Sequence, residues 1–189
     1  MKSKIFNAQE VQAIIAGNKT MFREVIKPQP NEQQKYLCVD DNDNIFLTDH
    51  NEFDNFLKGD GNEIKCPYKL EQDIFCKESF FEDLTYRKFA GFEAKDDLLQ
   101  INARYMKQEH SRLTLLIKEI KVERLGEISE EDCKKEGFKT AYKILSHGIF
   151  KKDASKFFIE NWNATHKKPE EKFEASPFVW CINFEVINN

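Results

Sequence analysis

Hydrophobic residues recur at helical spacing close to the start of the chain, where residues 7–17 carry one apolar stripe. Asn7 is a favourable N-cap, Glu10 stands at the capping-box position three residues later, and Gly17 can take the left-handed conformation that ends a helix. The pattern therefore predicts a short helix over this range. Its apolar stripe consists of Val11, Ile14 and Ile15.

The longest strand pattern covers residues 111–125. Its apolar positions alternate as far as Ile117 and then resume at Ile120 on the opposite parity. One change of parity within a strand is what a β-bulge produces, because the extra residue moves the later side chains to the other face. With the other strand patterns, it predicts an α+β fold, a small curved β-barrel with short flanking helices. Those other patterns cover residues 19–26, 35–48, 73–81, 85–94 and 177–187.

Two more helices are expected in the second half of the chain. The first covers residues 128–138, with Ser129 as its N-cap and Gly137 as its stop, and the second covers residues 154–162. Glu136 lies in the last turn of the first helix, where the helix macrodipole disfavours a carboxylate. The sequence leaves two interpretations of Glu136 open, a functional carboxylate or a solvated surface residue.

Length and charge limit the classes of function. The chain has 189 residues, 40% of them hydrophobic and 33% charged, which suits a single domain over residues 1–189. The net charge of −4 excludes a broadly basic surface. Any nucleic acid must therefore be bound by a local patch or pocket, and duplex binding through many phosphates is disfavoured.

Several kinds of site are not expected. The five cysteines include no Cys-x-x-Cys pair and no histidine at metal spacing, so we expect free thiols in a reducing compartment, with no metal and no cofactor. The start lacks an apolar signal core, and no stretch approaches the roughly 18 apolar residues of a membrane span, which predicts a cytoplasmic protein that binds no membrane. The turn at residues 40–44 has calcium-loop spacing, but Ile45 and Asn51 replace the required Gly and Glu. We interpret it as a solvated turn.

The run Gly17-Asn18-Lys19-Thr20 invites a phosphate-binding interpretation. A P-loop, however, has a longer glycine-spaced segment that follows a strand and precedes a helix, because its backbone N–H groups wrap the phosphates. Here the order is reversed, since the run follows a predicted helix and enters an extended segment. A nucleotide triphosphatase of the P-loop kind is therefore excluded.

Three separated segments together resemble the ASCH family, small β-barrels of the PUA-like superfamily, in the longer form found in bacteriophages and prophages. They are VQAIIAGNKTMFREVIKPQP at residues 11–30, LLIKEIKVERLGEISEEDCKKEGF at residues 115–138, and SPFVWCINFEV at residues 176–186. On this resemblance, Gly17, Lys19 and Thr20 fall on the family's Gly-x-Lys-Thr motif. Arg23 falls on one of the arginines that commonly follow it. The resemblance does not cover residues 31–70, where it implies an insertion in the single domain.

Two shorter segments extend the resemblance. DIFCKESF at residues 73–80 looks like a segment that usually reads Gly-Asp, a strand, then Val-Arg-Glu. Lys77 replaces the arginine, and its ammonium group is a point charge that cannot bind a phosphate bidentately as a guanidinium does. MKQEHSRL resembles a Met-Pro-Arg stretch that lacks its Pro-Arg pair and keeps Met106 and Arg112. The resemblance thus implies a ligand site formed by Lys19, Thr20, Arg23, Lys77, Glu78 and Arg112.

The family resemblance implies binding of RNA or of a nucleoside or nucleotide in a pocket at the barrel mouth. Some small members remove the acetyl group from N4-acetylcytidine with a Lys, a Thr and a Glu. Lys19 and Glu136 match the first and third, whereas the Thr position holds Phe22, so that Thr20 would have to substitute. Whether the protein is an enzyme therefore stays open.

The chemistry of the Lys–Glu pair is compatible with both functions. A desolvated lysine and a facing carboxylate can act as base and proton shuttle, or they can hold a nucleobase by hydrogen bonds beside an aromatic wall. Phe22 and Trp180 are candidates for that wall, although the apolar face of its strand favours the core for Trp180. A third hypothesis is an accessory factor of a phage or prophage that binds a protein partner through residues 31–70.

Overall fold

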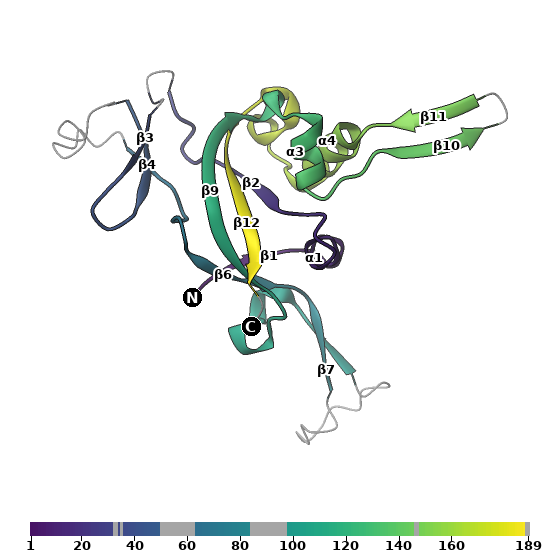
Figure 1. Cartoon of the computed structure of the whole chain (residues 1–189), viewed down its shortest axis with the longest axis horizontal. Helices are drawn as coiled ribbons and strands as arrows, with labels where there is room; N and C mark the ends of the chain where they lie inside the picture. Colours follow the sequence, from purple (N-terminus) through teal and green to yellow (C-terminus); the bar gives the residue numbers. More distant parts are fainter. Residues whose placement is uncertain (32–33, 35, 50–62, 84–97, 146–147, 188–189) are drawn as a thin grey trace.

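The computed structural model describes residues 1–31, 34, 36–49, 63–83, 98–145 and 148–187. It confirms the α+β class, since the described chain is dominated by strands and has few helices (Figure 1). The helices are α1 (Ala8–Ile15), α3 (Glu130–Lys135) and α4 (Ala154–Thr165), with short 3-10 segments at Ala103–Tyr105, Gln108–His110, Leu125–Glu127, Pro169–Glu171 and Phe173–Ala175. The strands are β1 (Lys2–Ile5), β2 (Met21–Val25), β3 (Tyr36–Val39), β4 (Ile45–Thr48), β5 (Ile64–Lys65), β6 (Asp73–Lys77), β7 (Phe80–Asp83), β8 (Leu98–Ile101), β9 (Thr114–Arg124), β10 (Ala141–Leu145), β11 (Gly148–Lys152) and β12 (Phe178–Ile187).

The main sheet has five strands in the order β1-β6-β9-β12-β2. β1 runs parallel to β6, and the other neighbours are antiparallel. The sheet curls until its two edges meet through side chains, because Lys4 of β1 forms an ion pair with Glu24 of β2 and lies over the ring of Phe22. No backbone ladder joins β1 to β2 among the described strands. The main sheet is therefore curled, and its described strands do not close into a barrel.

The predicted bulge in the long strand is present. Along the β9–β12 ladder, Asn183 pairs with Glu119 and Phe184 pairs with Ile117, so Lys118 is the extra residue. This insertion explains the change of parity between Ile117 and Ile120, both of which are buried. The bulge lets one strand keep its apolar side chains in the core on both sides of the bend.

Two apolar clusters fill the two sides of the curled sheet. The first lies inside the curl and includes Trp180, which is 2% exposed, so the core assignment of this tryptophan is confirmed. The second lies between the sheet and helices α3 and α4, and it includes Cys133, Phe158 and Trp162. Val186, near the end of β12, is 39% exposed, unlike the buried Trp180, Ile182 and Phe184 that precede it on the same face of the strand.

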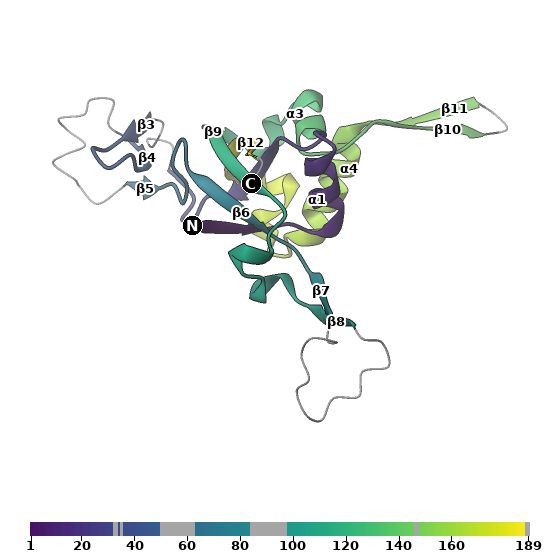
Figure 2. The ribbon, with the colours of Figure 1, turned by 60° about the horizontal axis from the view of Figure 1, so that its bottom comes forward.

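Three smaller sheets lie outside the main sheet (Figures 1 and 2). The predicted hairpin at residues 35–48 is confirmed as β3–β4, and β5 adds a third strand to it. The β7–β8 and β10–β11 pairs form the other two sheets. The hairpin β10–β11 projects away from the body in both views. The strand pair predicted around Gly91 lies outside the described residues.

In the acidic turn between β3 and β4, the carboxylate of Asp40 is hydrogen-bonded to other residues of the same turn. Asp40 accepts hydrogen bonds from the backbone N–H of Asn42 and Asn44 and from the Asn44 side chain.

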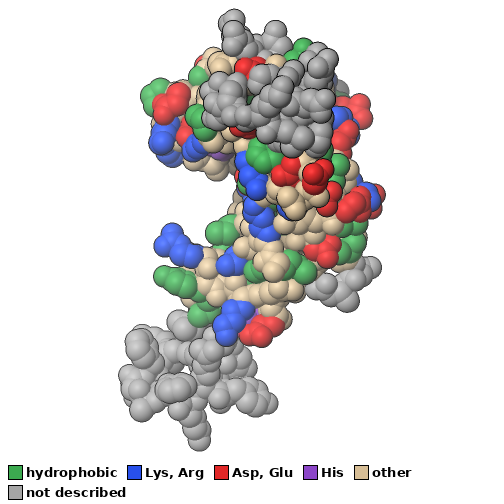
Figure 3. Space-filling model, turned by 90° about the vertical axis from the view of Figure 1, so that its left-hand side faces the viewer, with side chains coloured by type: hydrophobic (Ala, Val, Ile, Leu, Met, Phe, Trp, Pro, Cys, Tyr) green, Lys and Arg blue, Asp and Glu red, His purple; other side chains and the backbone are tan. Residues whose placement is uncertain are grey.

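On the face drawn in Figure 3, basic and acidic side chains gather on different sides, and neither charge covers the whole face. None of the helices in the described part of the chain has the length and apolarity that crossing a bilayer requires.

Candidate ligand-binding cleft

Lys19 is positioned by the end of helix α1. The predicted capping box is present, with the Asn7 side chain accepting from Glu10 N–H and the Glu10 carboxylate accepting from Asn7 N–H. Gly17 ends the helix with a φ of 67°, as predicted. The chain then turns so that Lys19 forms an isolated antiparallel bridge with Glu136. The two candidate residues, 117 positions apart, are therefore held together through their backbones.

Glu136 is positioned by the end of helix α3. Ser129 caps the helix start, and Glu136 is its C-cap residue. Gly137 follows with a φ of 95°, and a Cβ there would lie 3.3 Å from the Cβ atoms of both Ala13 and Lys19. A glycine is needed here for its conformation and for the close approach of α1 and α3. The carboxylate that opposes the helix dipole thus sits where two helix ends converge.

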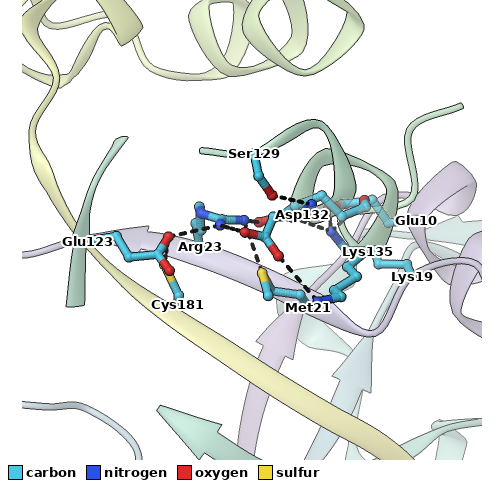
Figure 4. A network of polar contacts seen from close by, with 10 residues as sticks. Glu10, Lys19, Met21, Arg23, Glu123, Ser129, Asp132, Lys135 and Cys181 are labelled. Atoms are coloured by element: carbon cyan, nitrogen blue, oxygen red, sulfur yellow. Dashed lines mark hydrogen bonds and ion pairs between the residues drawn. The ribbon is translucent and has the colours of Figure 1, made fainter. Parts of the chain in front are cut away.

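The side chains of Lys19, Arg23 and Glu136 form one buried ionic cluster. Figure 4 shows Lys19 and Arg23 within the surrounding network of polar contacts. The Nζ atom of Lys19 donates to Glu136 Oε2 at 2.8 Å and to the Glu136 carbonyl at 3.0 Å. Arg23 donates from Nη1 to Glu136 Oε1 at 3.1 Å. Lys19 is 2% exposed, and Arg23 and Glu136 are each 6% exposed. One carboxylate therefore binds two cations, with a different oxygen for each.

Other carboxylates surround the same two cations. Glu10 lies 3.5 Å from the Nζ atom of Lys19. The Nη2 atom of Arg23 lies 3.1 Å from Glu123 and 3.7 Å from Asp132. The Nε atom of Arg23 is buried and has no hydrogen-bond partner in the described structure. Negative charge in this cluster thus exceeds positive charge.

Burial and charge act in opposite directions on the groups around Arg23. Burial alone would lower the pKa of Arg23, but the carboxylates of Glu136 and Glu123 raise it above its ordinary value. Burial raises the pKa of the Cys181 thiol, whose Sγ lies 3.3 Å from Glu123. The guanidinium therefore stays charged, and the thiol stays neutral.

A cleft of about 440 Å³ opens beside this cluster, between α1, β2 and α4. Its wall includes the ring of Trp162, on which the ring of His166 stacks with centroids 3.9 Å apart. Phe138 and Phe158 extend the aromatic wall. The polar groups that line the rest of the cleft include Asn7, Glu10, Asn161 and Thr165.

The predicted hydroxyl group does not reach this cleft. Thr20 is exposed, and its backbone bonds to Lys135 and Phe184. It lines a separate depression, which does not include Lys19 or Glu136. Phe22, at the position where the family has its Thr, is 3% exposed and packs edge-on against Phe6 and Tyr68.

The other three residues of the predicted ligand site also lie outside the cleft. Glu78 accepts two hydrogen bonds from Arg112, at 2.9 and 2.8 Å, and Lys77 donates to the carbonyl of Arg104. Glu78 and Arg112 line a small depression of about 220 Å³. The structure therefore gathers Lys19, Arg23 and Glu136, and it places Lys77, Glu78 and Arg112 elsewhere.

Some members of the cluster and the cleft wall were not singled out from sequence as site residues. The sequence predicts Glu10 only as a helix cap, and its patterns assign no site role to Trp162, Glu123 or His166. The capping box itself was the available signal for Glu10, because it fixes that carboxylate beside the segment that leads to Lys19. No sequence signal marks Glu123, which lies on β9 and contacts Arg23 of β2 across the intervening strand β12.

The region predicted as an insertion is only partly described. Residues 36–48 form β3 and β4, and three side chains of β3 are more than 40% exposed, namely Tyr36, Leu37 and Val39. Residues 50–62 lie outside the described part of the chain. Binding of a protein partner through residues 31–70 stays a prediction.

Comparisons with known proteins add little to this geometry. No family model matches the chain, and no curated protein matches it. Among solved structures, it is similar to protein EF3133 from Enterococcus faecalis V583, which is described with the family model DUF984. The alignment covers 100% of this chain and 82% of the other, with 9% sequence identity and a TM-score of 0.44. At this score the likeness carries no argument about fold or function.

Proposed function

We propose that the cleft beside Lys19 and Glu136 binds a nucleobase, presented either as a nucleoside or nucleotide or within single-stranded RNA. The observation that carries this proposal is the buried Glu136 carboxylate, which accepts from both Lys19 and Arg23 next to the ring of Trp162. A nucleobase has two aromatic faces and an edge of donors and acceptors. The cleft offers a complement to each, in aromatic rings and in fixed polar groups.

Energetics support a functional role for the ionic cluster. Buried ion pairs contribute little net stability, because desolvation of the charges offsets their attraction. Clusters of charged groups beside a cleft are more typical of binding and catalytic sites. The cleft volume of about 440 Å³ also lies within the range of small-molecule sites.

The charge balance immediately around Lys19 and Arg23 favours a neutral ring over a phosphate at that point of the cleft, whose outer lining also includes Lys4 and Lys27. Lys19 and Arg23 are the two cations of the cluster, and four carboxylates lie within 4 Å of them. A phosphate inside the cluster would meet this excess of negative charge. A base edge that donates N–H groups would instead find carboxylate acceptors, which suits cytosine, adenine or guanine.

We also propose that the curled sheet corresponds to the PUA-like barrel of the ASCH family. Support comes from the placement of the Gly-x-Lys-Thr run, which joins α1 to β2 and brings Lys19 to the C-cap of α3. The side-chain contact between β1 and β2 is the form that a nearly closed barrel would take. A crystal structure in which these strands diverge would overturn this assignment.

Amide hydrolysis at the N4 position of an acylated cytidine is the second candidate, and the 2.8 Å contact between Lys19 and Glu136 favours it. Against it, Nζ faces three oxygens in an arrangement that suits an ammonium group, whereas a base needs a free lone pair. Phe22 supplies no hydroxyl, and Thr20 lies outside the cleft. We expect no hydrolysis of N4-acetylcytidine, as measured by chromatographic detection of released cytidine. Turnover that Glu136→Gln abolishes would make the protein an enzyme.

Calorimetric titration with the four common ribonucleosides tests the binding proposal. We expect at least one to bind, and His166→Ala to weaken its affinity at least fivefold, because base–aromatic stacking contributes roughly 1–3 kcal/mol. Lys107→Gln is the control, since Lys107 is 76% exposed and lines neither the cleft nor the separate depression. Equal affinity in the parent and the His166 variant would place the ligand elsewhere.

A further inference from the structure

The hairpin β10–β11 is a basic segment in an acidic protein. Residues 137–152 contain four lysines and no aspartate or glutamate, in a chain whose net charge is −4. The hairpin projects from the body between α3 and α4 (Figures 1 and 2). We refer to the two strands Ala141–Leu145 and Gly148–Lys152 as the arm.

The arm carries an exposed aromatic side chain on each face. Tyr142 is 67% exposed and pairs with Lys151, whereas Phe150 is 53% exposed and pairs with Lys143. Because side chains alternate along a strand, Tyr142 and Phe150 lie on opposite faces of the ribbon. The two faces differ because Tyr142 also lines the depression that contains Thr20, at the base of the arm.

That depression has a volume of about 580 Å³ and lies between the end of α1, the end of α3 and the start of the arm. Three lysines, Lys134, Lys135 and Lys139, line it together with Tyr142 and a single carboxylate, Glu131. Lys135 pairs with Glu131 and Asp132. Lys134 and Lys139 form no ion pair with the described part of the chain, so their charges are available to a ligand.

We propose that the Tyr142 face of the arm and this depression form a docking surface for single-stranded nucleic acid. Lysines contact phosphates as point charges, and an exposed tyrosine stacks on an unpaired base. Charge complementarity favours this partner over a symmetric dimer in which two arms meet, because that contact would bring like charges together. The proposal does not depend on the cleft, because none of the residues that form this docking surface belongs to the Lys19–Glu136–Arg23 cluster.

Fluorescence anisotropy with a labelled single-stranded RNA of about 12 nucleotides tests the proposal. We expect binding that weakens steeply between about 50 and about 200 mM salt. Tyr142→Ala should weaken it at least fivefold, and Phe150→Ala, on the opposite face, less than twofold. Tyr105→Ala is a second control, since this tyrosine is 70% exposed on another part of the molecule. Equal losses for Tyr142→Ala and Phe150→Ala would overturn the assigned face.

The lysines are tested by the salt dependence of the same binding. Lys139→Gln should reduce the slope of log affinity against log salt by about one unit, because each phosphate contact contributes roughly that much. Lys107→Gln, which removes a lysine that is 76% exposed elsewhere, should leave the slope unchanged. An unchanged slope in the Lys139 variant would remove the depression from the proposal.

A shortened arm distinguishes nucleic acid from a protein partner. Replacement of residues 142–151 by Asn-Gly keeps the paired ends Ala141 and Lys152 and closes them with a two-residue hairpin turn. We expect the shortened protein to keep its thermal stability and its oligomeric state and to lose at least tenfold in RNA affinity. Retained RNA binding, or a change in oligomeric state alone, would overturn the proposal. RNA binding without nucleoside binding would contradict the function proposed for the cleft and leave the proposal for the arm in place.

Discussion

Glu136 is the residue on which the candidate site depends most. It occupies a helix C-cap where the dipole disfavours a carboxylate, and it is compensated there by Lys19 and Arg23. Loss of its charge would leave two buried cations with fewer partners. Glu10 would remain for Lys19, and Glu123 and Asp132 would remain for Arg23.

The first prediction concerns this shared carboxylate. Glu136→Gln should lower the free energy of unfolding by roughly 1–3 kcal/mol, less than the roughly 3–5 kcal/mol typical of a buried charge that loses its only partner. Urea denaturation of parent and variant measures it. Glu131→Gln is the control, because Glu131 is 80% exposed in the same helix. An unfolding free energy equal to that of the parent would mean that the cluster is not held as described.

The second prediction concerns Glu130, which caps a helix other than its own. Its carboxylate accepts from the backbone N–H of Ser155 at 3.0 Å and Ala154 at 2.7 Å, at the start of α4. These bonds lower the pKa of Glu130 from 4.5 to about 2, although desolvation opposes them. Since the folded pKa is the lower one, the stabilisation is complete above pH 4.5 and is lost as the pH falls toward 2.

Urea denaturation as a function of pH measures that contribution. We expect the parent to lose stability between pH 4.5 and 2, and Glu130→Gln to lose less over the same range. The variant should be less stable than the parent at neutral pH. Parallel pH profiles for the two proteins would show that Glu130 does not cap α4.

At the scale of elements, the two glycines that have a positive φ within the described residues serve different purposes. Gly17 ends α1 with open space around it, whereas Gly137 ends α3 against Ala13 and Lys19. An alanine at either position takes a left-handed conformation that costs roughly 1–2 kcal/mol. At Gly137 the added Cβ must also fit at 3.3 Å from two neighbouring atoms.

The third prediction follows from this difference. Gly137→Ala should destabilise the protein more than Gly17→Ala does, and it should weaken nucleoside binding because it separates Lys19 from Glu136. Thermal denaturation and calorimetric titration of both variants measure the two effects. A larger loss for Gly17→Ala would contradict the close approach of α1 and α3.

Elements whose signals are local were predictable from sequence. The caps at Asn7 and Ser129, the glycine stops and the bulge at Lys118 each depend on residues within one turn or one strand. The sequence does not predict the arm, because the two residues that join its strands, Ser146 and His147, are not one of the dipeptides typical of hairpin turns. The pairing of Lys19 with Glu136 came from the family resemblance and not from any local pattern.

The remainder of the site depends on tertiary packing. Arg23 meets carboxylates from β9 and α3, and Trp162 and His166 reach the cleft from α4. No spacing of residues in the sequence indicates which of the many carboxylates lie beside Arg23. Lys77, Glu78 and Arg112 were grouped with Lys19 on motif order, but Glu78 and Arg112 pair with each other outside the cleft.

At the scale of the whole molecule, an acidic protein carries two separate surfaces of different character. The cleft places carboxylates and aromatic rings together, which suits a neutral base. The arm and its depression place lysines and a tyrosine together, which suits a phosphate backbone. Both would be used by a single-stranded nucleic acid, and either can be removed without the other.

The two tryptophans provide the most direct test of the central claim, that the cleft binds a nucleobase. Trp162 lines the cleft and donates its indole N–H to the Glu171 carbonyl at 2.8 Å, whereas Trp180 is buried inside the curled sheet. In a nitrogen–proton correlation spectrum each gives one indole signal. On titration with the ribonucleoside that binds best, we predict a saturable shift of the Trp162 signal and an unchanged Trp180 signal. An unchanged Trp162 signal at saturating nucleoside would contradict the account.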